Sequence, residues 1–556
     1  MDQEKKEQVF TVSVAEEVIK ENNGCPEPTE QDWAELRETA DTIPKAALLV
    51  ILIEFCERFT YYGLSGPFQN YVQFPDPPFY PATQPGALGK GQQTATALTT
   101  FFQFWCYITP IIGAIIADSY LGKYKSILYF SLIYFVGLLI LALSSIPSAI
   151  QSGAAFPGFV VGIIVIGLGT GGIKSNVSPL VAEQYRSQNP FVKTLPSGER
   201  VIVTPQATYQ KLFNMFYWGI NVGSLSAIAT TSLEKYVGFW AAYLLPTLMF
   251  IPGIITVIAG RNQYVQNPPR GSIFIEVFKV LKVSFRRGLE AAKPSNLVHT
   301  HPDLAAKATW DDVFVDELRR TFRACAVFCW FPIYWLCYSQ MTNNLISMTA
   351  TMQTGDVPND ILQNINPLTL IIAIPVFDAV IYPAFRRLHM PLRPIMRMTC
   401  GFIFASGAMA YCAGIQSYIY RQPPYYDHPA GNKNDVSVAL AIPAYVLIGI
   451  SEIFASITGL EYAFKKAPAK MKSLVMALFL FTNCLASVLG FALVSVAVDP
   501  KLTYLYTGVA AAMGICAPLF YWIHGKNDRN DIADDAIGRN QDESYTPPEK
   551  MDPSAP

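Results

Sequence analysis

Long apolar stretches dominate the chain and alternate with short polar connections. Each stretch is about 20 residues or longer, the length that an α-helix needs to cross the hydrocarbon core of a bilayer. Gly and Pro are frequent within them, and membrane helices tolerate both because neighbouring helices satisfy the freed backbone groups. The pattern predicts twelve membrane-spanning helices, near residues 45–72, 92–118, 124–147, 157–180, 208–231, 239–260, 322–345, 365–386, 395–418, 437–464, 472–498 and 502–524.

The longest internal polar stretch divides these helices six and six. It covers residues 261–321 and is predicted to be a cytoplasmic linker between two six-helix bundles, residues 44–260 and 322–524. Two membrane halves joined in this way are typical of transporters whose halves move against each other. Residues 1–43 are expected to form a polar cytoplasmic N-terminal segment, and residues 525–556 a disordered cytoplasmic tail.

The linker is predicted to contain amphipathic helices. The first runs from Ile273 to Leu289, and a second begins near Thr309. A basic amphipathic helix of this kind lies at a membrane surface or serves as a docking site for a calmodulin-like or other partner. We expect the membrane surface, and the apolar residues that share one side of the helix are Phe274, Phe278, Leu281 and Phe285.

Basic residues are distributed unequally between the two membrane faces. The loops after helices two, four, eight and ten carry thirteen Lys and Arg residues, whereas the loops of the opposite face carry only Lys90, Lys235, Arg421, Lys433 and Lys501. Because Lys and Arg are retained on the cytoplasmic side, the first face is predicted to be cytoplasmic. An even number of spans then places both termini in the cytoplasm.

Composition excludes several other classes of protein. AVILMFWYC residues make up 51% of the chain and charged residues 15%, against about 25% in a soluble protein, so several soluble domains are excluded. The formal net charge is -1, which removes any electrostatic case for nucleic-acid binding. The ten cysteines and five histidines form no zinc-ligand pattern and no triad-like set. We therefore expect neither an enzyme nor a resident metal or cofactor.

A few charged residues fall inside the predicted membrane helices. An ionisable group at the centre of a bilayer costs about 2.5–3.5 kcal/mol, so each one needs a reason. Glu54, Glu57 and Arg58 occupy one face of the first helix, and Tyr61 and Tyr62 extend that face by a turn. A purely structural ion pair accounts for the arginine and one glutamate but leaves a second carboxylate, which indicates a functional role.

Two further charges complete a polar arrangement between the halves. Lys174 lies inside helix four and needs an anionic partner, for which we expect the spare carboxylate of helix one. The glycines before it lack the spacing of a phosphate loop and predict close helix packing. Glu452 lies inside helix ten. A cationic pole in the first half and an anionic residue in the second suit a zwitterion held between them.

At this point the sequence resembles a known family. Glu54-Phe-Cys-Glu57-Arg58-Phe-Thr-Tyr61-Tyr62-Gly resembles the ExxERFxYYG signature of the proton-dependent oligopeptide transporter family, and residues 216–224 resemble its second signature. Residues 113–123, and a weaker counterpart at 375–387, are similar to the loop signature of the major facilitator superfamily. Residues 32–37 and the short loop 419–436 resemble fungal members.

The resemblance implies a major facilitator fold that imports di- and tripeptides with protons by alternating access. It implies that Arg58 and Lys174 receive the peptide carboxylate, and that Glu452 with Asn221 and Asn366 receives the amino terminus. The residues implied to line side-chain pockets are Tyr61, Tyr62, Tyr107, Tyr217, Trp335, Ser456 and Phe479. The residues implied in proton coupling are Glu54, Glu57, Arg58 and Lys174. We expect a monomer in the plasma membrane, with the proton as coupling ion.

The chain also departs from the family pattern. Ser65 and Ser339 replace an Arg and a helix-seven carboxylate that are paired in many members, and Thr100 stands where some animal relatives have a histidine. The residues that form the outer gate are therefore not defined by the sequence. A carrier of nitrate or another small anion or metabolite, and a non-transporting peptide sensor, remain alternatives. Glu452 disfavours the anion carrier, since it would repel an anion.

Overall fold

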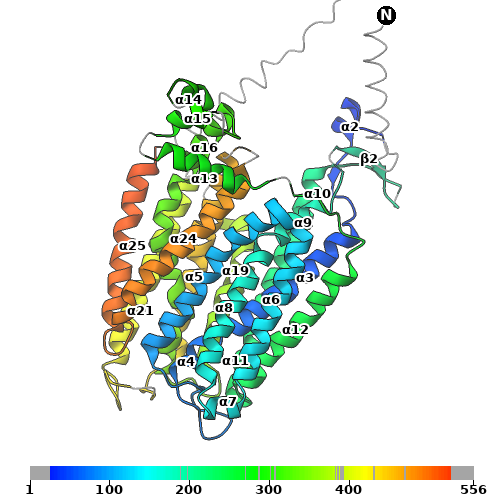
Figure 1. Cartoon of the computed structure of the whole chain (residues 1–556). Coiled ribbons are helices and arrows are strands. Elements are labelled where there is room, and N and C mark those ends of the chain that lie inside the picture. The colour runs from blue at the N-terminus through cyan, green and yellow to red at the C-terminus, as the bar shows by residue number, and fades with distance from the viewer. Residues whose placement is uncertain are drawn as a thin grey trace, which may run out of the picture.

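The protein is almost entirely helical in the computed structural model, with its helices arranged in two neighbouring bundles (Figure 1). The structure describes residues 26–526, except for residues 188, 197, 270, 286–287, 301, 306–307, 382–383, 385–386, 388–392, 430–431, 467 and 469–470. Most of the predicted N-terminal segment and nearly all of the predicted C-terminal tail therefore lie outside the described residues.

The first bundle contains the helices between Lys45 and Ala259. Several spans are built from two consecutive helices, with breaks at Gly66–Pro67, Ser175–Asn176 and Leu225. The helices are α3 (Lys45–Ser65), α4 (Phe68–Gln73), α5 (Gln92–Ile116), α6 (Lys123–Ser144), α7 (Pro147–Gln151), α8 (Ala155–Lys174), α9 (Val177–Glu183), α10 (Pro205–Ser224), α11 (Ser226–Tyr236) and α12 (Phe239–Ala259).

The second bundle has more breaks in its helices. Its segments are η3 (Cys325–Trp330), α17 (Phe331–Ser339), η4 (Gln340–Thr342), α18 (Asn344–Ala350), η5 (Asn359–Asn364), α19 (Ile365–Val376), η6 (Phe377–Ile381), α21 (Pro394–Ile419), η7 (Val438–Ala441), α22 (Ile442–Glu452), η8 (Ile453–Ile457), α23 (Thr458–Lys466), α24 (Lys472–Leu493), η10 (Val494–Val496) and α25 (Leu502–His524).

All twelve predicted spans correspond to a helix or to consecutive helical segments. Eight of the described helices are long and apolar enough to cross a membrane by length and composition. The other four spans are α3–α4, α10–α11, η3 to α18, and η5 to η6, which contain charged or polar residues or breaks. The less apolar spans are also those that supply much of the central cavity described below.

The glycine run of helix four packs helices together, as predicted. A Cβ on Gly169 would lie 2.6 Å from Tyr134 Cα in α6, and one on Gly171 would lie 2.6 Å from the Thr109 carbonyl carbon in α5. Real Cβ atoms do not approach backbone this closely. Only glycine therefore allows α8 to approach both neighbours.

A shared backbone feature marks the two regions with the repeated loop motif. The second span ends in a π-helical turn, η1 (Ala117–Leu121), and the eighth ends in another, η6 (Phe377–Ile381). A π-turn is rare and holds one residue more than the corresponding α-helical turn. The two halves therefore share this geometry at the positions of Asp118 and Asp378. The Asp378 side chain and Arg386 lie outside the described part of the chain.

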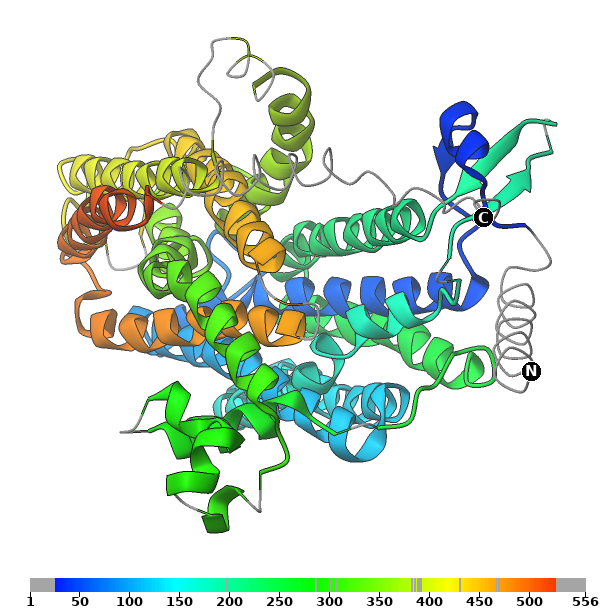
Figure 2. The same ribbon diagram turned by 90° about the horizontal axis from the view of Figure 1, so that it is seen from above.

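A small sheet, which the sequence did not predict, lies at the linker end of the first bundle. Its strands β1 (Glu38–Thr39), β2 (Phe191–Thr194) and β3 (Arg200–Val203) have the order β1-β3-β2, with β1 parallel and β2 antiparallel to β3. The sheet adjoins the short helix α2 (Glu30–Glu35) (Figures 1 and 2). Two ion pairs attach the N-terminal segment to the β2–β3 hairpin. Arg37 pairs with Glu199 at 2.6 Å, and Arg200 pairs with Asp32 at 3.0 Å.

The start of α2 gives a test of this attachment. The backbone N–H and hydroxyl of Thr29 donate to Asp32 at 3.0 and 2.8 Å and hold the pKa of Asp32 below its usual value, and Arg200 adds to this effect. A lowered pKa means that the stabilisation is present above the ordinary pKa of Asp and is lost as pH falls through the lowered value. We expect Asp32→Ala to speed amide exchange over residues 29–39 about fivefold at neutral pH.

Hydrogen–deuterium exchange with mass spectrometry measures this change. Glu30→Gln is the matched control, since Glu30 lies in the same first turn and is not the capping residue. Equal exchange in the Asp32→Ala variant and the unmodified protein would show that the capping box and the Arg200 pair do not hold the segment in place.

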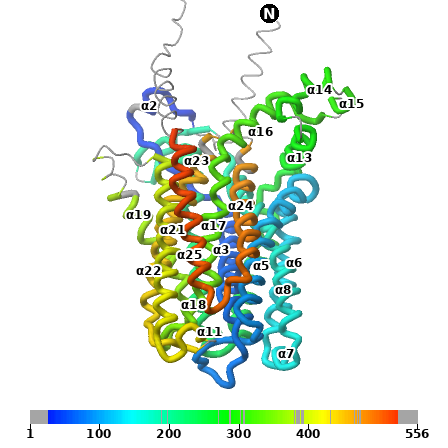
Figure 3. Tube along the Cα trace, turned by 90° about the vertical axis from the view of Figure 1, so that its left-hand side faces the viewer, coloured from blue at the N-terminus to red at the C-terminus, as the bar shows by residue number. Residues whose placement is uncertain are grey.

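The linker packs against both bundles on the same side as the sheet (Figures 1 and 3). Its helices α13 (Ile273–Ser284) and α16 (Asp312–Ala324) share an apolar core with Met471, Leu474 and the partly buried Ala114 and Ile115. The predicted apolar side of α13 is divided, because Phe274 is buried in this core while Phe278 and Phe285 are 58% and 76% exposed. The exposed pair stays available for the predicted membrane surface.

Candidate functional site

A cavity of about 370 Å³ lies between the two bundles. The first bundle contributes α3, α5 and α10 to its wall, and the second contributes α17, α19 and α22. Its volume falls within the range of about 300–1,000 Å³ that is usual for small-molecule sites. Seven of the predicted substrate residues line it, namely Tyr61, Tyr62, Tyr107, Tyr217, Asn221, Asn366 and Glu452.

The charges of α3 lie directly behind the tyrosines of the first bundle. Arg58 Nε lies 3.1 Å from Glu54 Oε1, and Arg58 Nη2 lies 2.5 Å from Glu57 Oε2. All three residues are buried, and the Arg58 guanidinium carbon lies 5.3 Å from the centre of the Tyr61 ring. Both glutamates therefore pair with the same arginine, whereas the sequence led us to expect one of them to be left for Lys174.

Lys174 does not form the ion pair that the sequence suggested. Its ammonium lies 3.7 Å from the centre of the Tyr107 ring, and no described carboxylate lies within ion-pairing distance. A cation–π contact replaces the expected partner, because Arg58 holds both carboxylates of α3. Tyr107 lines the cavity, so Lys174, like Arg58, stands one layer behind the wall.

An acceptor group occupies the opposite wall. Asn366 Nδ2 in α19 donates to Glu452 Oε2 at the end of α22 and to the Tyr338 hydroxyl, each at 3.1 Å. Asn366 Oδ1 is buried and accepts no hydrogen bond from the described residues. Glu452, Asn366 and Tyr338 all line the cavity. This wall therefore offers a carboxylate to a cationic ligand, while Asn366 holds that carboxylate in place.

Ser456 does not reach the cavity, in contrast to the expectation. Regular helical spacing would place it one turn after Glu452 on the same face. The segment η8 is a π-turn instead, so the residue that follows Glu452 by five positions takes that place. Ile457 accordingly lines the cavity, and this part of the wall is apolar.

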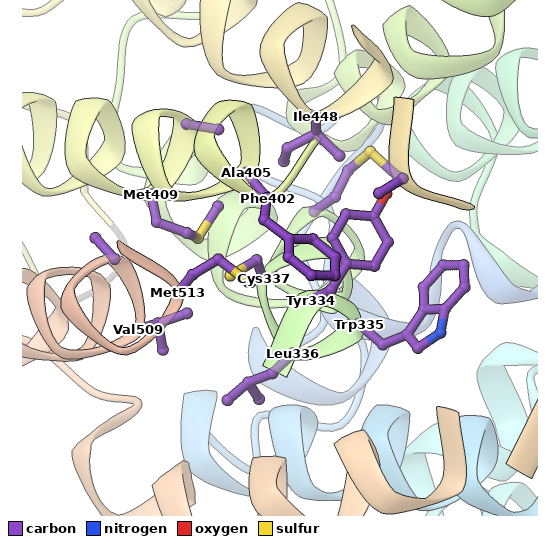
Figure 4. Packing of buried hydrophobic residues seen from close by; sticks show 14 of the residues in the cluster. Tyr334, Trp335, Leu336, Cys337, Phe402, Ala405, Met409, Ile448, Val509 and Met513 are labelled. Carbon is purple, nitrogen blue, oxygen red and sulfur yellow. The ribbon is translucent and has the colours of Figure 1, made fainter. Parts of the chain in front are cut away.

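Trp335 and Phe479 form a second layer behind the wall. Both are 6% exposed, and Trp335 Nε1 donates to the Thr482 hydroxyl at 3.0 Å. Trp335 lies at the edge of the packed core of the second bundle (Figure 4), 5.4 Å from Tyr338 between ring centres. Tyr338 stands at the cavity in their place, so the two aromatic residues support the wall without forming it.

Several polar residues of the cavity were not predicted. They lie in the first and second bundles and include Ser65, Thr99, Gln103, Tyr338, Thr342, Gln363 and Asn364. Gln363 and Asn364 fall just outside a predicted span, and the others are uncharged residues within spans, so no charge drew attention to them. They add neutral donors and acceptors between the charged poles.

The cavity is closed at the end far from the linker by hydrogen bonds between the bundles. We call this end the far end. Gln69 donates to the Ser347 hydroxyl at 3.0 Å, and the Thr96 hydroxyl donates to Asn344 Oδ1 at 3.3 Å. Ser339 donates to the backbone of its own helix. Neutral side chains form these two hydrogen bonds, and the Arg–carboxylate pair found in many family members is replaced here by Ser65 and Ser339.

Comparisons with known proteins agree with this architecture. Residues 124–512 match the family model described as "POT family". The chain is 50% identical over 502 residues to "Probable peptide transporter ptr2" of Schizosaccharomyces pombe, covering 90% of this chain and 80% of the relative. It is 46% identical over 499 residues to "Peptide transporter PTR2" of Saccharomyces cerevisiae, covering 89% and 81%.

Solved structures show the same fold. The crystal structure of the POT family transporter PepTSo superposes with a TM-score of 0.68 at 22% identity and covers 88% of this chain and 99% of that chain. An auto-inhibited POT family peptide transporter superposes with a TM-score of 0.67 at 23% identity, covering 86% and 96%. The fold is therefore that of a multi-pass membrane transporter with two six-helix bundles.

Proposed function

Because this chain belongs to the POT family, we propose that it is a peptide transporter that imports di- and tripeptides together with protons. The observation that carries the proposal is the cavity, which has Arg58 and Lys174 behind one wall and Glu452 on the other. A short peptide is a zwitterion whose two charged ends lie apart by the length of its backbone. Opposite poles on two bundles hold such a molecule and discriminate against ligands with a single charge.

The binding mode follows from the groups that face the cavity. Glu452, held by the Asn366 amide, receives the peptide ammonium. The peptide carboxylate approaches Arg58 and Lys174 past Tyr61 and Tyr107, whose rings cover the two cations. The remaining tyrosines and neutral polar residues contact the peptide bond and the side chains.

Proton coupling follows from a charge count around Arg58. With both glutamates ionised, Arg58 and Lys174 balance Glu54 and Glu57. A substrate carboxylate that enters this buried region adds one negative charge, and a proton bound by a glutamate restores neutrality. The proton is thus the coupling ion, and the charges around Arg58 balance without a resident cofactor.

The proposed orientation places the linker face in the cytoplasm and the far end outside the plasma membrane. The basic residues of the linker-side loops support this assignment. The structure, closed at the far end, is then the inward-facing state of an alternating-access cycle. The complete cavity lies within one chain, so the protein acts as a monomer in the bilayer.

The alternatives fit the site less well. A nitrate or other anion carrier would place its ligand against Glu452, at an energetic cost. A peptide sensor would need the binding poles but not two glutamates on one buried arginine.

Uptake of labelled dialanine into proteoliposomes tests the proposal. We expect an inward proton gradient to drive accumulation, and tripeptides but not free amino acids to compete. Accumulation that ignores the gradient would contradict proton coupling. Competition by free amino acids alone would contradict peptide transport, and protein-free liposomes give the background.

A further inference from the structure

Two carboxyl groups, one from each bundle, face each other at the far end. Glu234 lies near the end of α11, and Asp360 lies in η5, which leads into α19. Both residues are fully buried, with 0% of their surface exposed. Their carboxyl groups lie within hydrogen-bonding contact of each other. We call Glu234 and Asp360 the carboxyl pair.

The hydrogen bonds around the pair require a proton. Asn70 Nδ2 donates to Glu234 Oε1 at 2.9 Å. Glu234 Oε2 and both oxygens of Asp360 accept no hydrogen bond from another described side chain. An ionised carboxylate only accepts hydrogen bonds, so two carboxyl groups in contact need a proton on one of them. Two buried negative charges in contact would also repel each other strongly.

The charged groups around the pair also indicate one bound proton. Lys235 donates to the carbonyl oxygens of Gly355 and Val357 at 3.2 and 3.3 Å, and it interacts electrostatically with Asp356, Asp360 and Lys433. Two ammonium groups thus face three carboxyl groups, and one proton on the pair makes the region neutral. Among the described residues, the remaining titratable groups that face the pair are the hydroxyls of Tyr80, Tyr243 and Tyr445.

The pair joins the bundles together with a neighbouring pair of amides. Asn70 Nδ2 donates to Asn359 Oδ1 at 2.9 Å, and Asn359 Nδ2 donates to Asn70 Oδ1 at 3.1 Å. Asn70 therefore contacts both Asn359 and Glu234. Separation of the bundles at this end breaks these bonds and exposes both carboxyl groups to outer water, where Asp and Glu ionise well below neutral pH.

We propose that the Glu234–Asp360 pair is a second proton-binding site, which must take up one proton before the far end of the cavity can close. The proton comes from the medium on the far side and sits between the two carboxyl groups in the closed state. External acidity then favours closure and the inward-facing state. This inference rests on the proposed transport function and adds a gate-linked proton to the one bound near Arg58.

Distance measurements across the far end test the proposal without requiring transport. Spin labels on ketone-bearing amino acids at Ser152 and Asp427, both exposed on opposite bundles, report closure in the full-length protein in nanodiscs. We expect the closed-to-open ratio of the unmodified protein to rise as pH falls, by up to about tenfold per pH unit for one bound proton. In Glu234→Gln/Asp360→Asn this one-proton slope is lost, because neutral amides close the end without a proton.

Two further variants make the outcome specific. Asp435→Asn is the matched control, since Asp435 is an exposed acid of the second bundle that is not among the charged groups around the pair, and its slope should match the unmodified protein. Glu234→Asp keeps a carboxyl group but disturbs the packing, and it should retain the slope that the double variant loses. An unchanged slope in the double variant, or an equal loss in Glu234→Asp, would overturn the proposal.

The result is separable from the test of the proposed function. The distance measurement uses no peptide, so a pH-dependent far end without dialanine uptake would refute peptide transport and leave the carboxyl pair standing. Proton-driven dialanine uptake with a pH-independent distance would refute the proposed role of the carboxyl pair and leave peptide transport standing.

Discussion

Glu452→Gln is expected to weaken dialanine binding by at least about 30-fold, or about 2 kcal/mol. Loss of one member of a buried charge pair costs about 2–5 kcal/mol, and glutamine keeps one carbonyl acceptor, so the lower part of that range applies. Asn366 donates to Glu452, and the glutamine can still accept this hydrogen bond, so the wall should keep its shape. Isothermal titration calorimetry of the purified protein measures the change.

A comparison of two ligands isolates the charge interaction. N-acetyl-dialanine lacks the ammonium group, so it should bind the unmodified protein much more weakly than dialanine does. In the Glu452→Gln variant the difference between the two ligands should nearly vanish, as in a double-mutant cycle. If the variant discriminates between the ligands as well as the unmodified protein does, the peptide amino terminus does not bind at Glu452.

Glu57→Gln should abolish gradient-driven accumulation while dialanine exchange continues. Glu57 is fully buried, and its carboxylate is 2.5 Å from Arg58 Nη2. The neutral glutamine cannot take up a proton when a substrate carboxylate approaches the arginine. A gradient of one pH unit supports about tenfold accumulation per coupled proton, and the variant should reach only the external concentration.

Two assays on the same proteoliposomes separate coupling from binding. Accumulation under an inward proton gradient should be lost, and counterflow between equal pH values should persist within about twofold, because it needs no net proton movement. Glu290→Gln serves as the control, since Glu290 is ion-paired to Arg319 in the linker, outside the cavity. Normal accumulation by the Glu57→Gln variant would exclude Glu57 as the coupling group.

The sequence was most informative where the interactions are local. Glu54, Glu57 and Arg58 lie within a single turn and a half of helix, so their spacing alone brings them together. The twelve spans were recognisable because each one must be apolar over a fixed length. The neighbour of Lys174 was not predictable, since a cation can pair with a carboxylate or lie on an aromatic ring, and only the packing of α5 against α8 decides between them.

The features that sequence reasoning missed depend on segments far apart in the chain. Glu234 and Asp360 were assigned to loops because they fall a few residues outside the predicted spans, yet both are fully buried. Their contact joins positions in different bundles. The small sheet was missed for the same reason, since strands of two to four residues carry little pattern and pair with distant partners.

The π-turn η8 has a consequence for how side-chain preference can change in this protein. It places the next position on the cavity face five residues after Glu452, so the length of the helix, as well as its residues, determines the wall. Deletion of Ile457 would restore four-residue spacing and bring the hydroxyl of Ser456 to the cavity in place of a branched aliphatic chain. A one-residue indel at this turn can therefore convert an apolar subsite into a polar one, which no single substitution elsewhere on α22 would do.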